Sequence, residues 1–129
     1  ASGYRANEVG RMFGRDVPCI SLAHQYLVTE GIPELAARDT KLPLLRDPDS
    51  SYYLRQDKHG LNLGPYERNC KAHWVTPDDP MPDDFSFQLY PDDLERLELY
   101  IEDAIGRVPL LGTQGVRRVI NGSITYARV

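Results

Sequence analysis

A nine-residue segment with a period of two, LAHQYLVTE at residues 22–30, constrains the fold more than any other feature of the chain. A period of two predicts a β-strand. One face of this strand carries Leu22, His24, Tyr26 and Val28. An imidazole within such a stripe requires a hydrogen-bonding partner or access to a cavity, because an unpaired buried polar group is costly. The segment therefore predicts a sheet and makes His24 a candidate for a functional site.

Helical patterns lie on both sides of this strand. Residues 4–13 have apolar side chains at helical spacing, with Ser2 as a candidate N-cap and Gly14 as a C-terminal stop. Two prolines limit residues 32–43 to one or two helical turns. A longer helix is predicted over residues 91–108, because its opening proline suits the first helical position. The apolar stripe of the first helix is Ala6, Val9, Met12 and Phe13. The expected buried face of the long helix is Leu94, Leu97, Ile101, Ala104, Ile105 and Val108.

Two further segments are predicted to form hairpins. Residues 52–63 reverse direction at the polar turn DKHG, and residues 116–126 have the pattern strand, Asn121-Gly122 turn, strand. The segment 76–84 is predicted to be a loop, because its prolines and acids cannot bury apolar surface. Strands and helices therefore mix without regular alternation. This mixture predicts the α+β class, with a mixed, largely antiparallel sheet and helices packed on one side.

Composition and charge exclude several kinds of partner. The chain has 129 residues, enough for one core, and its net charge of -4 argues against nucleic acid or an anionic membrane as the main partner. No apolar run is long enough to span a bilayer, and no signal peptide is recognisable. Cys19 and Cys70 do not form a disulfide framework, which favours the cytoplasm, or the mitochondrial matrix in a eukaryote. Because the chain begins without methionine and ends within a predicted strand, we expect it to be part of a longer protein.

Most candidate sites in the sequence are better explained as ordinary structure. Cys70 and His73 have the spacing of a zinc-ligand pair, but no second pair accompanies them, so no metal site is predicted. Cys19 lies in the apolar run VPCI and is predicted to be a buried thiol. The acidic loop 78–84 lacks an EF-hand pattern and is predicted to be solvated. The sequence has no glycine-rich phosphate motif, so the main fingerprint of any nucleotide cofactor would lie elsewhere.

One predicted strand face has more specific chemistry. Tyr53 and Arg55 share a face of the hairpin, whereas Tyr52 lies on the opposite face. A guanidinium beside a phenol can hold a carboxylate, because arginine binds it bidentately and tyrosine adds a neutral donor. A nearby imidazole would add a group that titrates near neutral pH. Spacing alone leaves two interpretations open, a carboxylate-binding site and an ordinary hydrogen-bonded sheet surface.

Several segments share their order and spacing with one family of flavoenzymes. They are ASGYRANEVGRM, AHQYLVTEGIPEL, LPLLRDPDSSYYLRQDKHGLNLGPYE and VPLLGTQGVRRVINGSITY. Over nearly its whole length the chain resembles the dimethylglycine and sarcosine dehydrogenases, within the D-amino-acid-oxidase-like group of FAD-dependent amine oxidoreductases. The resemblance implies that residues 1–14 end the FAD domain. It also implies that residues 15–129 form a substrate-binding domain, in which a mixed sheet covers the flavin.

The resemblance implies roles for residues of the predicted sheet. His24 matches the active-site histidine near the substrate amine. Tyr53 matches the active-site tyrosine, and a register error of one residue would put Tyr52 in its place. Tyr26, Tyr52 and Arg55 are expected to contact the substrate, with Arg55 assigned from its place on the sheet face.

Positions near the two ends of the chain match segments that approach the cofactor in this family. Residues 1–3, with Gly3, match the end of a strand near the adenosine half of FAD. Asn121 and Gly122 match the turn into a strand that runs toward the flavin. The family continues after that strand with a proline, aspartate and glycine turn, whereas this chain reads Ala127-Arg128-Val129. The departure leaves the flavin-facing end undefined.

The activity implied by the resemblance is oxidative demethylation of a small N-methyl amino acid, sarcosine or dimethylglycine, by hydride transfer to FAD. FAD would be bound mainly by chain outside this sequence, and folate is a further ligand expected of the full-length protein. We therefore expect this segment alone to be inactive. Two alternatives remain open: a non-catalytic α+β binding module, and a diverged homologue without redox activity.

Overall fold

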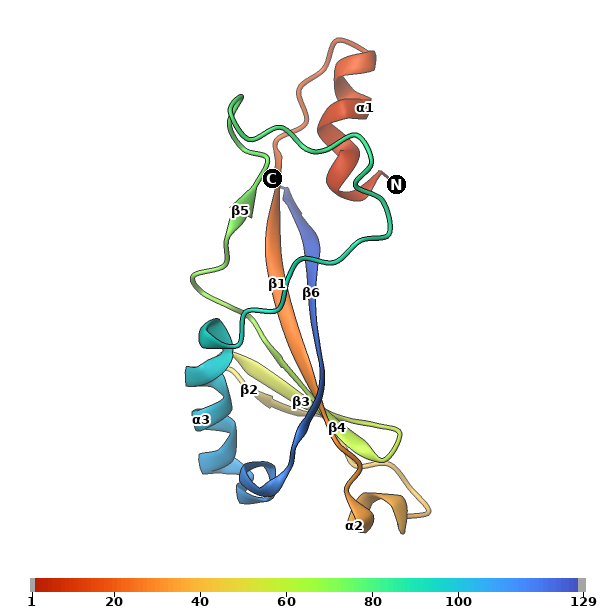
Figure 1. Ribbon diagram of the computed structural model, residues 1–129, viewed down its shortest axis with the longest axis vertical. Helices are drawn as coiled ribbons and strands as arrows, with labels where there is room; N and C mark the ends of the chain where they lie inside the picture. The colour runs from red at the N-terminus through yellow and green to blue at the C-terminus, as the bar shows by residue number, and fades with distance from the viewer. Residues whose placement is uncertain (1, 128–129) are drawn as a thin grey trace. The chain divides into compact units, whose positions relative to one another are not determined.

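The computed structural model describes residues 2–127, which form two compact units (Figure 1). The described part of the first unit comprises residues 2–24, 68–90 and 122–127, and the second unit comprises residues 25–67 and 91–121. Two long strands, β1 (Cys19–Thr29) and β6 (Val116–Ala127), contribute residues to both units and pair with each other. No helix within residues 2–127 has the length and apolar character needed to cross a membrane.

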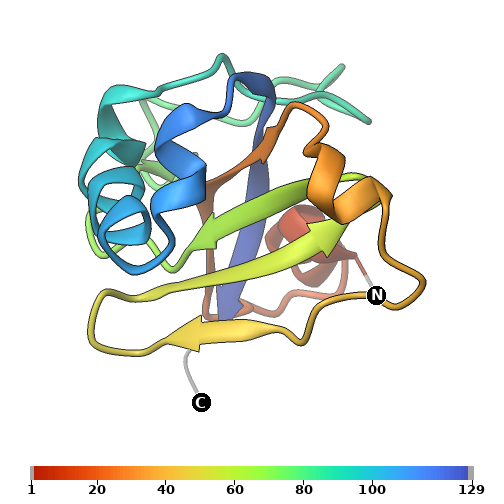
Figure 2. The same ribbon diagram turned by 90° about the horizontal axis from the view of Figure 1, so that it is seen from below.

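The second unit is built on antiparallel strands. Its hydrogen-bonded order is β2-β3-β4-β1. The strands β3 and β4 form the predicted hairpin, with Asp57 opposite Gly60 and with Lys58 in the left-handed region at φ +54°. Figure 2 shows β2, β3 and β4 side by side. The strands added to β1 are β2 (Leu45–Asp47), β3 (Tyr52–Asp57) and β4 (Gly60–Pro65).

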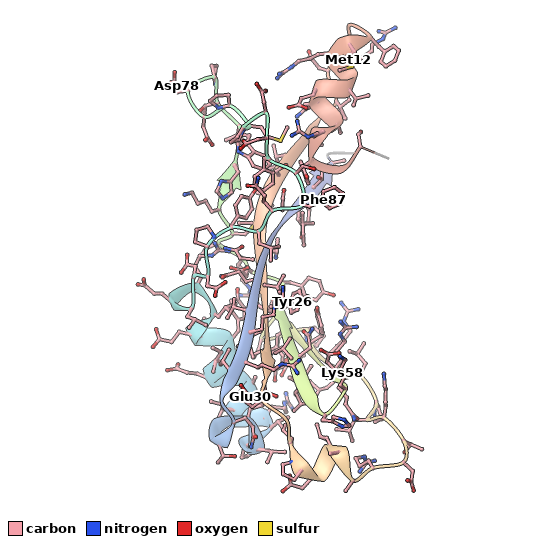
Figure 3. All side chains as sticks on the ribbon, turned by 45° about the vertical axis from the view of Figure 1, so that its right-hand side comes forward. Met12, Tyr26, Glu30, Lys58, Asp78 and Phe87 are labelled. Carbon is pink, nitrogen blue, oxygen red and sulfur yellow. The ribbon has the colours of Figure 1, made fainter. Side chains whose placement is uncertain are left out.

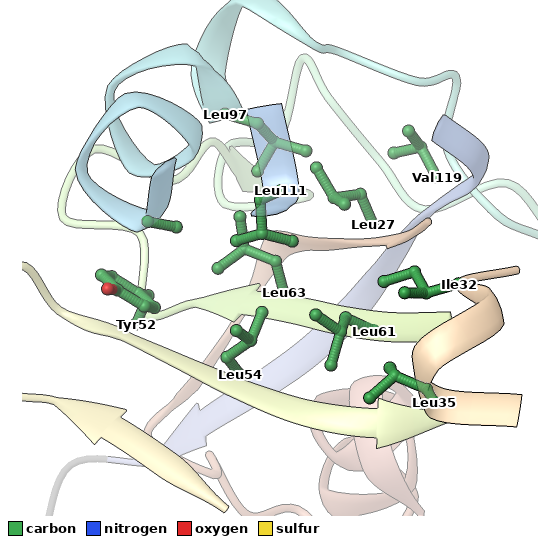
Figure 4. Packing of buried hydrophobic residues seen from close by; sticks show 11 residues of the cluster. Leu27, Ile32, Leu35, Tyr52, Leu54, Leu61, Leu63, Leu97, Leu111 and Val119 are labelled. Atoms are coloured by element: carbon green, nitrogen blue, oxygen red, sulfur yellow. The ribbon is translucent and has the colours of Figure 1, made fainter. Parts of the chain in front are cut away.

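Helices cover one face of these strands and form the core of the second unit (Figure 4). Across the strands, Leu27 pairs with Leu63 and Leu63 with Leu54, so their side chains project from the same face. The helical elements are α2 (Pro33–Ala36), the 3-10 turn η2 (Glu95–Leu97), α3 (Glu98–Arg107) and the 3-10 turn η3 (Pro109–Thr113). The core cluster contains Leu27, Ile32, Leu35, Tyr52, Leu54, Leu61, Leu63, Leu97, Ala104, Leu111 and Val119.

The first unit contains the N-terminal helix and a cluster of aromatic rings. A 3-10 turn, η1 (Gly3–Arg5), leads into α1 (Ala6–Met12), and the short strand β5 (Ala72–His73) pairs with β1. The ring of His73 stacks on that of Tyr90 with centroids 4.2 Å apart. Further ring contacts join Tyr4, Trp74, Phe85 and Tyr90.

The predicted α+β class and largely antiparallel sheet are confirmed, because every strand pair with a defined register is antiparallel. The predicted Asn121-Gly122 turn is wrong, since β6 runs without interruption through both residues. A type I′ turn needs positive φ at both central positions, and neither residue has it. Asn121 is instead buried, and its Nδ2 donates to the backbone oxygen of Pro91 at 2.7 Å.

The long predicted helix begins later than expected, at Glu95 as a 3-10 turn. The backbone just before it is held by Gln25, whose Nε2 donates to Asp93 O (2.9 Å) and whose Oε1 accepts from Asp93 N–H (2.8 Å). These bonds fix Asp93 outside the helix. Leu94 is therefore exposed, contrary to the predicted buried face, whereas Leu97 and Ala104 are buried as expected.

The helix predicted over residues 4–13 forms, but its apolar stripe is not a buried face. Met12 and Phe13 are 79% and 76% exposed, and Val9 is also exposed (Figure 3 labels Met12). Ser2 makes no side-chain capping bond to this segment. Gly14 has φ +65°, which is the left-handed conformation of the predicted stop.

Candidate functional site

The second unit has a polar sheet face opposite its core. The register pairs Arg46 of β2 with Tyr53 of β3, and Tyr53 with Gly64 of β4. Arg55 lies two residues beyond Tyr53 and is therefore on the same side. The register of β1 with β4 pairs Val28 with Asn62, so its continuation places Tyr26, labelled in Figure 3, opposite Gly64. We call this surface the phenol–arginine face; its residues are Tyr26, Arg46, Tyr53, Arg55, Asn62, Gly64 and Tyr66.

The ring of Tyr53 lies directly over Gly64. A Cβ at residue 64 would meet Tyr53 Cζ at 2.2 Å, so only glycine leaves room for this ring position. The ring of Tyr66 meets that of Tyr53 edge to face, with centroids 6.0 Å apart. Burial raises the pKa of the Tyr53 phenol above its ordinary value, so the group remains a neutral hydrogen-bond donor at physiological pH. The sequence therefore places a rigid neutral donor on this face.

Among the residues that the structure describes, two arginines on the phenol–arginine face have no acidic partner. Arg46 lies over the ring of Tyr66, 5.4 Å from its centroid, and its Nη2 donates to Tyr66 Oη at 3.3 Å. Within residues 2–127, neither Arg46 nor Arg55 has a carboxylate at ion-pair distance. Guanidinium groups that are exposed, unneutralised and beside a phenol favour an anionic ligand, and a carboxylate matches their planar geometry.

Tyr52 lies on the opposite face from Tyr53. It is 1% exposed and belongs to the hydrophobic core cluster. Burial raises the pKa of its phenol as well. Of the two adjacent tyrosines named from the sequence, the structure thus places Tyr53 on the phenol–arginine face and Tyr52 inside the protein.

His24 belongs to the first unit, in the central part of β1. Its side chain is buried, and its Nε2 lies 3.2 Å from Tyr126 Oη, with the two rings 5.7 Å apart. The imidazole thus has the hydrogen-bonding partner that its burial requires. Sequence reasoning did not identify Tyr126 as this partner, because about a hundred positions separate the two residues in the chain and no local pattern joins them.

The positions named for FAD contact, Gly3, Asn121 and Gly122, have different surroundings. The amide nitrogen of Asn121 donates to the backbone oxygen of Pro91, and a Cβ at Gly122 would make an ordinary van der Waals contact with Leu89 Cδ2 at 3.6 Å. Gly3 has φ +54° and open space around it, but Ala1, named with it, lies outside the described residues. The chain end at Arg128 and Val129 also lies outside them.

The cysteine and histidine residues considered as metal ligands do not form a cluster in the described part of the chain. Cys19 is buried, as predicted, and Cys70 is a free cysteine of intermediate exposure. His73 is stacked on Tyr90 in the aromatic cluster. Among residues 2–127, no three side chains of the metal-ligating types lie close enough together to hold an ion.

Four members of the phenol–arginine face were not identified as site residues from the sequence: Asn62, Gly64, Arg46 and Tyr66. The positions of Asn62 and Gly64 could have been predicted from the sequence. A hairpin that pairs Asp57 with Gly60 necessarily pairs Arg55 with Asn62 and Tyr53 with Gly64. The position of Arg46 could not be predicted in this way, since its pairing with Tyr53 depends on an irregular connection between β2 and β3.

Comparison with curated proteins connects this chain with known enzymes. It is 44% identical to mouse dimethylglycine dehydrogenase, mitochondrial, and 43% identical to the human protein of that name, in each case over 98% of this chain. It is 37% identical to human sarcosine dehydrogenase, mitochondrial, over 97% of this chain. The chain is similar to one segment of these dehydrogenases. The predicted resemblance is therefore confirmed.

The similarity covers a small part of each dehydrogenase. The chain spans 15% of the length of the dimethylglycine dehydrogenases and 13% of the human sarcosine dehydrogenase. No protein-family model matches the chain. The chain is therefore similar to a short segment of much longer enzymes.

Proposed function

We propose that this chain is part of the substrate-binding region of an FAD-dependent dehydrogenase that oxidatively demethylates sarcosine or dimethylglycine. The observation that supports the proposal is the phenol–arginine face, which combines a neutral phenol with two arginines that have no acidic partner in the described part of the chain. The named relatives are dehydrogenases of N-methyl amino acids. A ligand of that kind carries a carboxylate, the group that such a face is suited to bind.

Within this proposal, Arg55 binds the substrate carboxylate and Tyr53 donates a neutral hydrogen bond to it. Tyr26 borders the ligand, and Gly64 keeps the Tyr53 ring in position. His24 is proposed, from the family resemblance, to hold or accept the proton of the substrate amine. Its burial and its bond to Tyr126 would restrict the orientation of the ring. Tyr52 is left out of the substrate contacts, because it lies in the core.

FAD would be bound mainly by other parts of the full-length protein, where it would accept the hydride lost from the N-methyl carbon. Water would convert the resulting iminium into formaldehyde and the demethylated amino acid. The word mitochondrial in the relatives' names favours the mitochondrial matrix over the cytoplasm as the proposed location. Folate remains a proposed ligand of the longer protein. The division into residues 1–14 of an FAD domain and 15–129 of a substrate domain also remains a proposal.

The proposal can be tested by assaying the full-length protein that contains this chain, with FAD and an artificial electron acceptor. We expect formaldehyde from sarcosine or dimethylglycine and little from trimethylamine, which has no carboxylate. Arg55→Gln is expected to raise KM by about ten- to a hundredfold, because a charge-assisted bond is worth about 1.5–3 kcal/mol. His24→Ala, assayed beside it, is expected to lower kcat and shift the pH profile.

Arg38→Gln is the matched control, because it removes the same charge at an exposed position at the end of α2. The control is expected to leave KM unchanged. If neither N-methyl amino acid is demethylated, the proposed activity is wrong. If Arg55→Gln and Arg38→Gln have the same KM, the carboxylate does not bind at the phenol–arginine face.

A further inference from the structure

Asn62 is a buried polar side chain without a complete set of partners. It lies in the middle of β4 and is 2% exposed. Its Oδ1 is buried and accepts no hydrogen bond from the described residues. Buried polar atoms in native proteins nearly always have a partner, and an unpaired one costs about 1–3 kcal/mol. An acceptor in this state can accept a hydrogen bond from a water or from a ligand.

The position of Asn62 relates it to the proposed carboxylate site. Asn62 is paired in register with Arg55 on β3 and with Val28 on β1. Side chains opposite each other across an antiparallel pair project to the same side, with Cβ atoms about 5 Å apart. Asn62 and the exposed Arg55 therefore project from neighbouring positions on the same face of the sheet.

The chemistry of the two neighbours is complementary to an α-amino acid. Arg55 offers donors to an anion, whereas Asn62 Oδ1 offers an acceptor to an N–H group. In an α-amino acid the carboxylate and the amine nitrogen are attached to the same carbon, so both groups can be reached from adjacent positions on a sheet. Val28, the other neighbour of Asn62, is apolar and has no hydrogen bond to offer from its side chain.

We propose that Asn62 binds the amine N–H of the substrate while Arg55 binds its carboxylate. This inference rests on the proposed function and adds a substrate-positioning residue to it. The pair thus favours sarcosine, which keeps an N–H when its amine is neutral, over dimethylglycine, which has an N–H only when protonated.

The test compares sarcosine with methoxyacetate, in which an ether oxygen replaces the N–H, on the full-length protein. For Asn62→Leu we expect KM for sarcosine to rise about tenfold, with kcat changed less. The inhibition constant of methoxyacetate is expected to stay within about twofold of the wild-type value, because that ligand has no proton to donate to Asn62. Asn69→Leu, at an exposed asparagine, is the control and should leave both constants unchanged.

The outcomes separate this inference from the proposed function. If Asn62→Leu changes neither ligand, or weakens both equally, Asn62 does not bind the amine. Asn62→Ala repeats the comparison if leucine prevents folding. Arg55→Gln should weaken both ligands; if it weakens neither, the carboxylate site itself is wrong. If the protein turns over no substrate, the proposed activity has failed, and calorimetric binding of the two ligands then tests Asn62 directly.

Discussion

The two faces of strand β3 differ in what surrounds nearly identical side chains. Tyr52 and Tyr53 are adjacent in the sequence, yet the first packs among leucines beneath the helices and the second lies over Gly64 beside Tyr66. The pleat of the strand sends successive residues to opposite sides. The two residues are of the same type, so their different environments follow from their alternate positions along the strand and not from their chemistry.

The two faces also differ in the partners of their arginine side chains. On the core side, Arg107 at the end of α3 donates to Asp47 Oδ2 at 2.9 Å. The backbone N–H of Ser50 and this guanidinium lower the pKa of the Asp47 carboxyl below its ordinary value. On the phenol–arginine face, Arg46 and Arg55 have no such partner within the described chain. One face uses its charge to join a helix to a strand, and the other leaves it available to a ligand.

The strongest test of this contrast is the truncation of a core leucine. Leu63→Ala should lower the free energy of unfolding by about 3 kcal/mol, because it removes a buried side chain and leaves a cavity. Denaturant unfolding of the full-length protein measures the change. Leu99→Ala, on the exposed side of α3, is the matched control and should cost less than about 0.5 kcal/mol. If both variants lose the same free energy of unfolding, the helices do not bury the core face of the sheet.

A smaller effect, confined to the opposite face, is expected from Gly64→Ala. The added methyl group would overlap the Tyr53 ring, which must move, so we expect a loss of about 1–3 kcal/mol in stability. We also expect KM for the N-methyl amino acid to rise about tenfold. Gly106→Ala in α3 is the control, since a Cβ there meets no atom within 4 Å. If Gly64→Ala retains the wild-type KM, the position of the Tyr53 ring over Gly64 does not matter for substrate binding.

The smallest effect should come from removing one phenol oxygen. Tyr53→Phe is expected to raise KM about fivefold through loss of a neutral hydrogen bond, whereas Tyr52→Phe should leave KM unchanged. Because burial raises the pKa of both phenols, the difference should persist between about pH 6 and 9. Steady-state kinetics at several pH values measure it. A larger effect for Tyr52→Phe would reverse the assignment of the two faces.

Local patterns in the sequence predicted most of the elements in this structure. The alternation at residues 22–30 predicted the strand β1, and the polar turn DKHG predicted the hairpin of β3 and β4. The same hairpin predicted that Tyr53 and Arg55 share a face. These features depend on neighbours in sequence, for which period and turn chemistry are reliable guides.

The errors arose where distant residues decide the conformation. Asn121 and Gly122 form a good turn in isolation, but the burial of Asn121 and its bond to Pro91 keep them in a strand. The helix start at Pro91 failed because Gln25, far away in the chain, holds the backbone of Asp93. No sequence pattern could predict that Asn62 Oδ1 is buried without a partner, because only the packed structure shows which polar atoms are hydrogen-bonded.

The buried carboxylate of Glu67 limits how this segment can be engineered. Glu67 Oε1 accepts the backbone N–H of Gln25 at 2.7 Å, in place of a neighbouring strand, and its Oε2 accepts from Arg96 Nε at 2.9 Å. The end of the hairpin, the middle of β1 and the start of the long helix thus share one acidic side chain. A chimera that receives this hairpin from a similar protein must therefore transfer residue 67 together with residue 96, because otherwise one buried charge loses its partner.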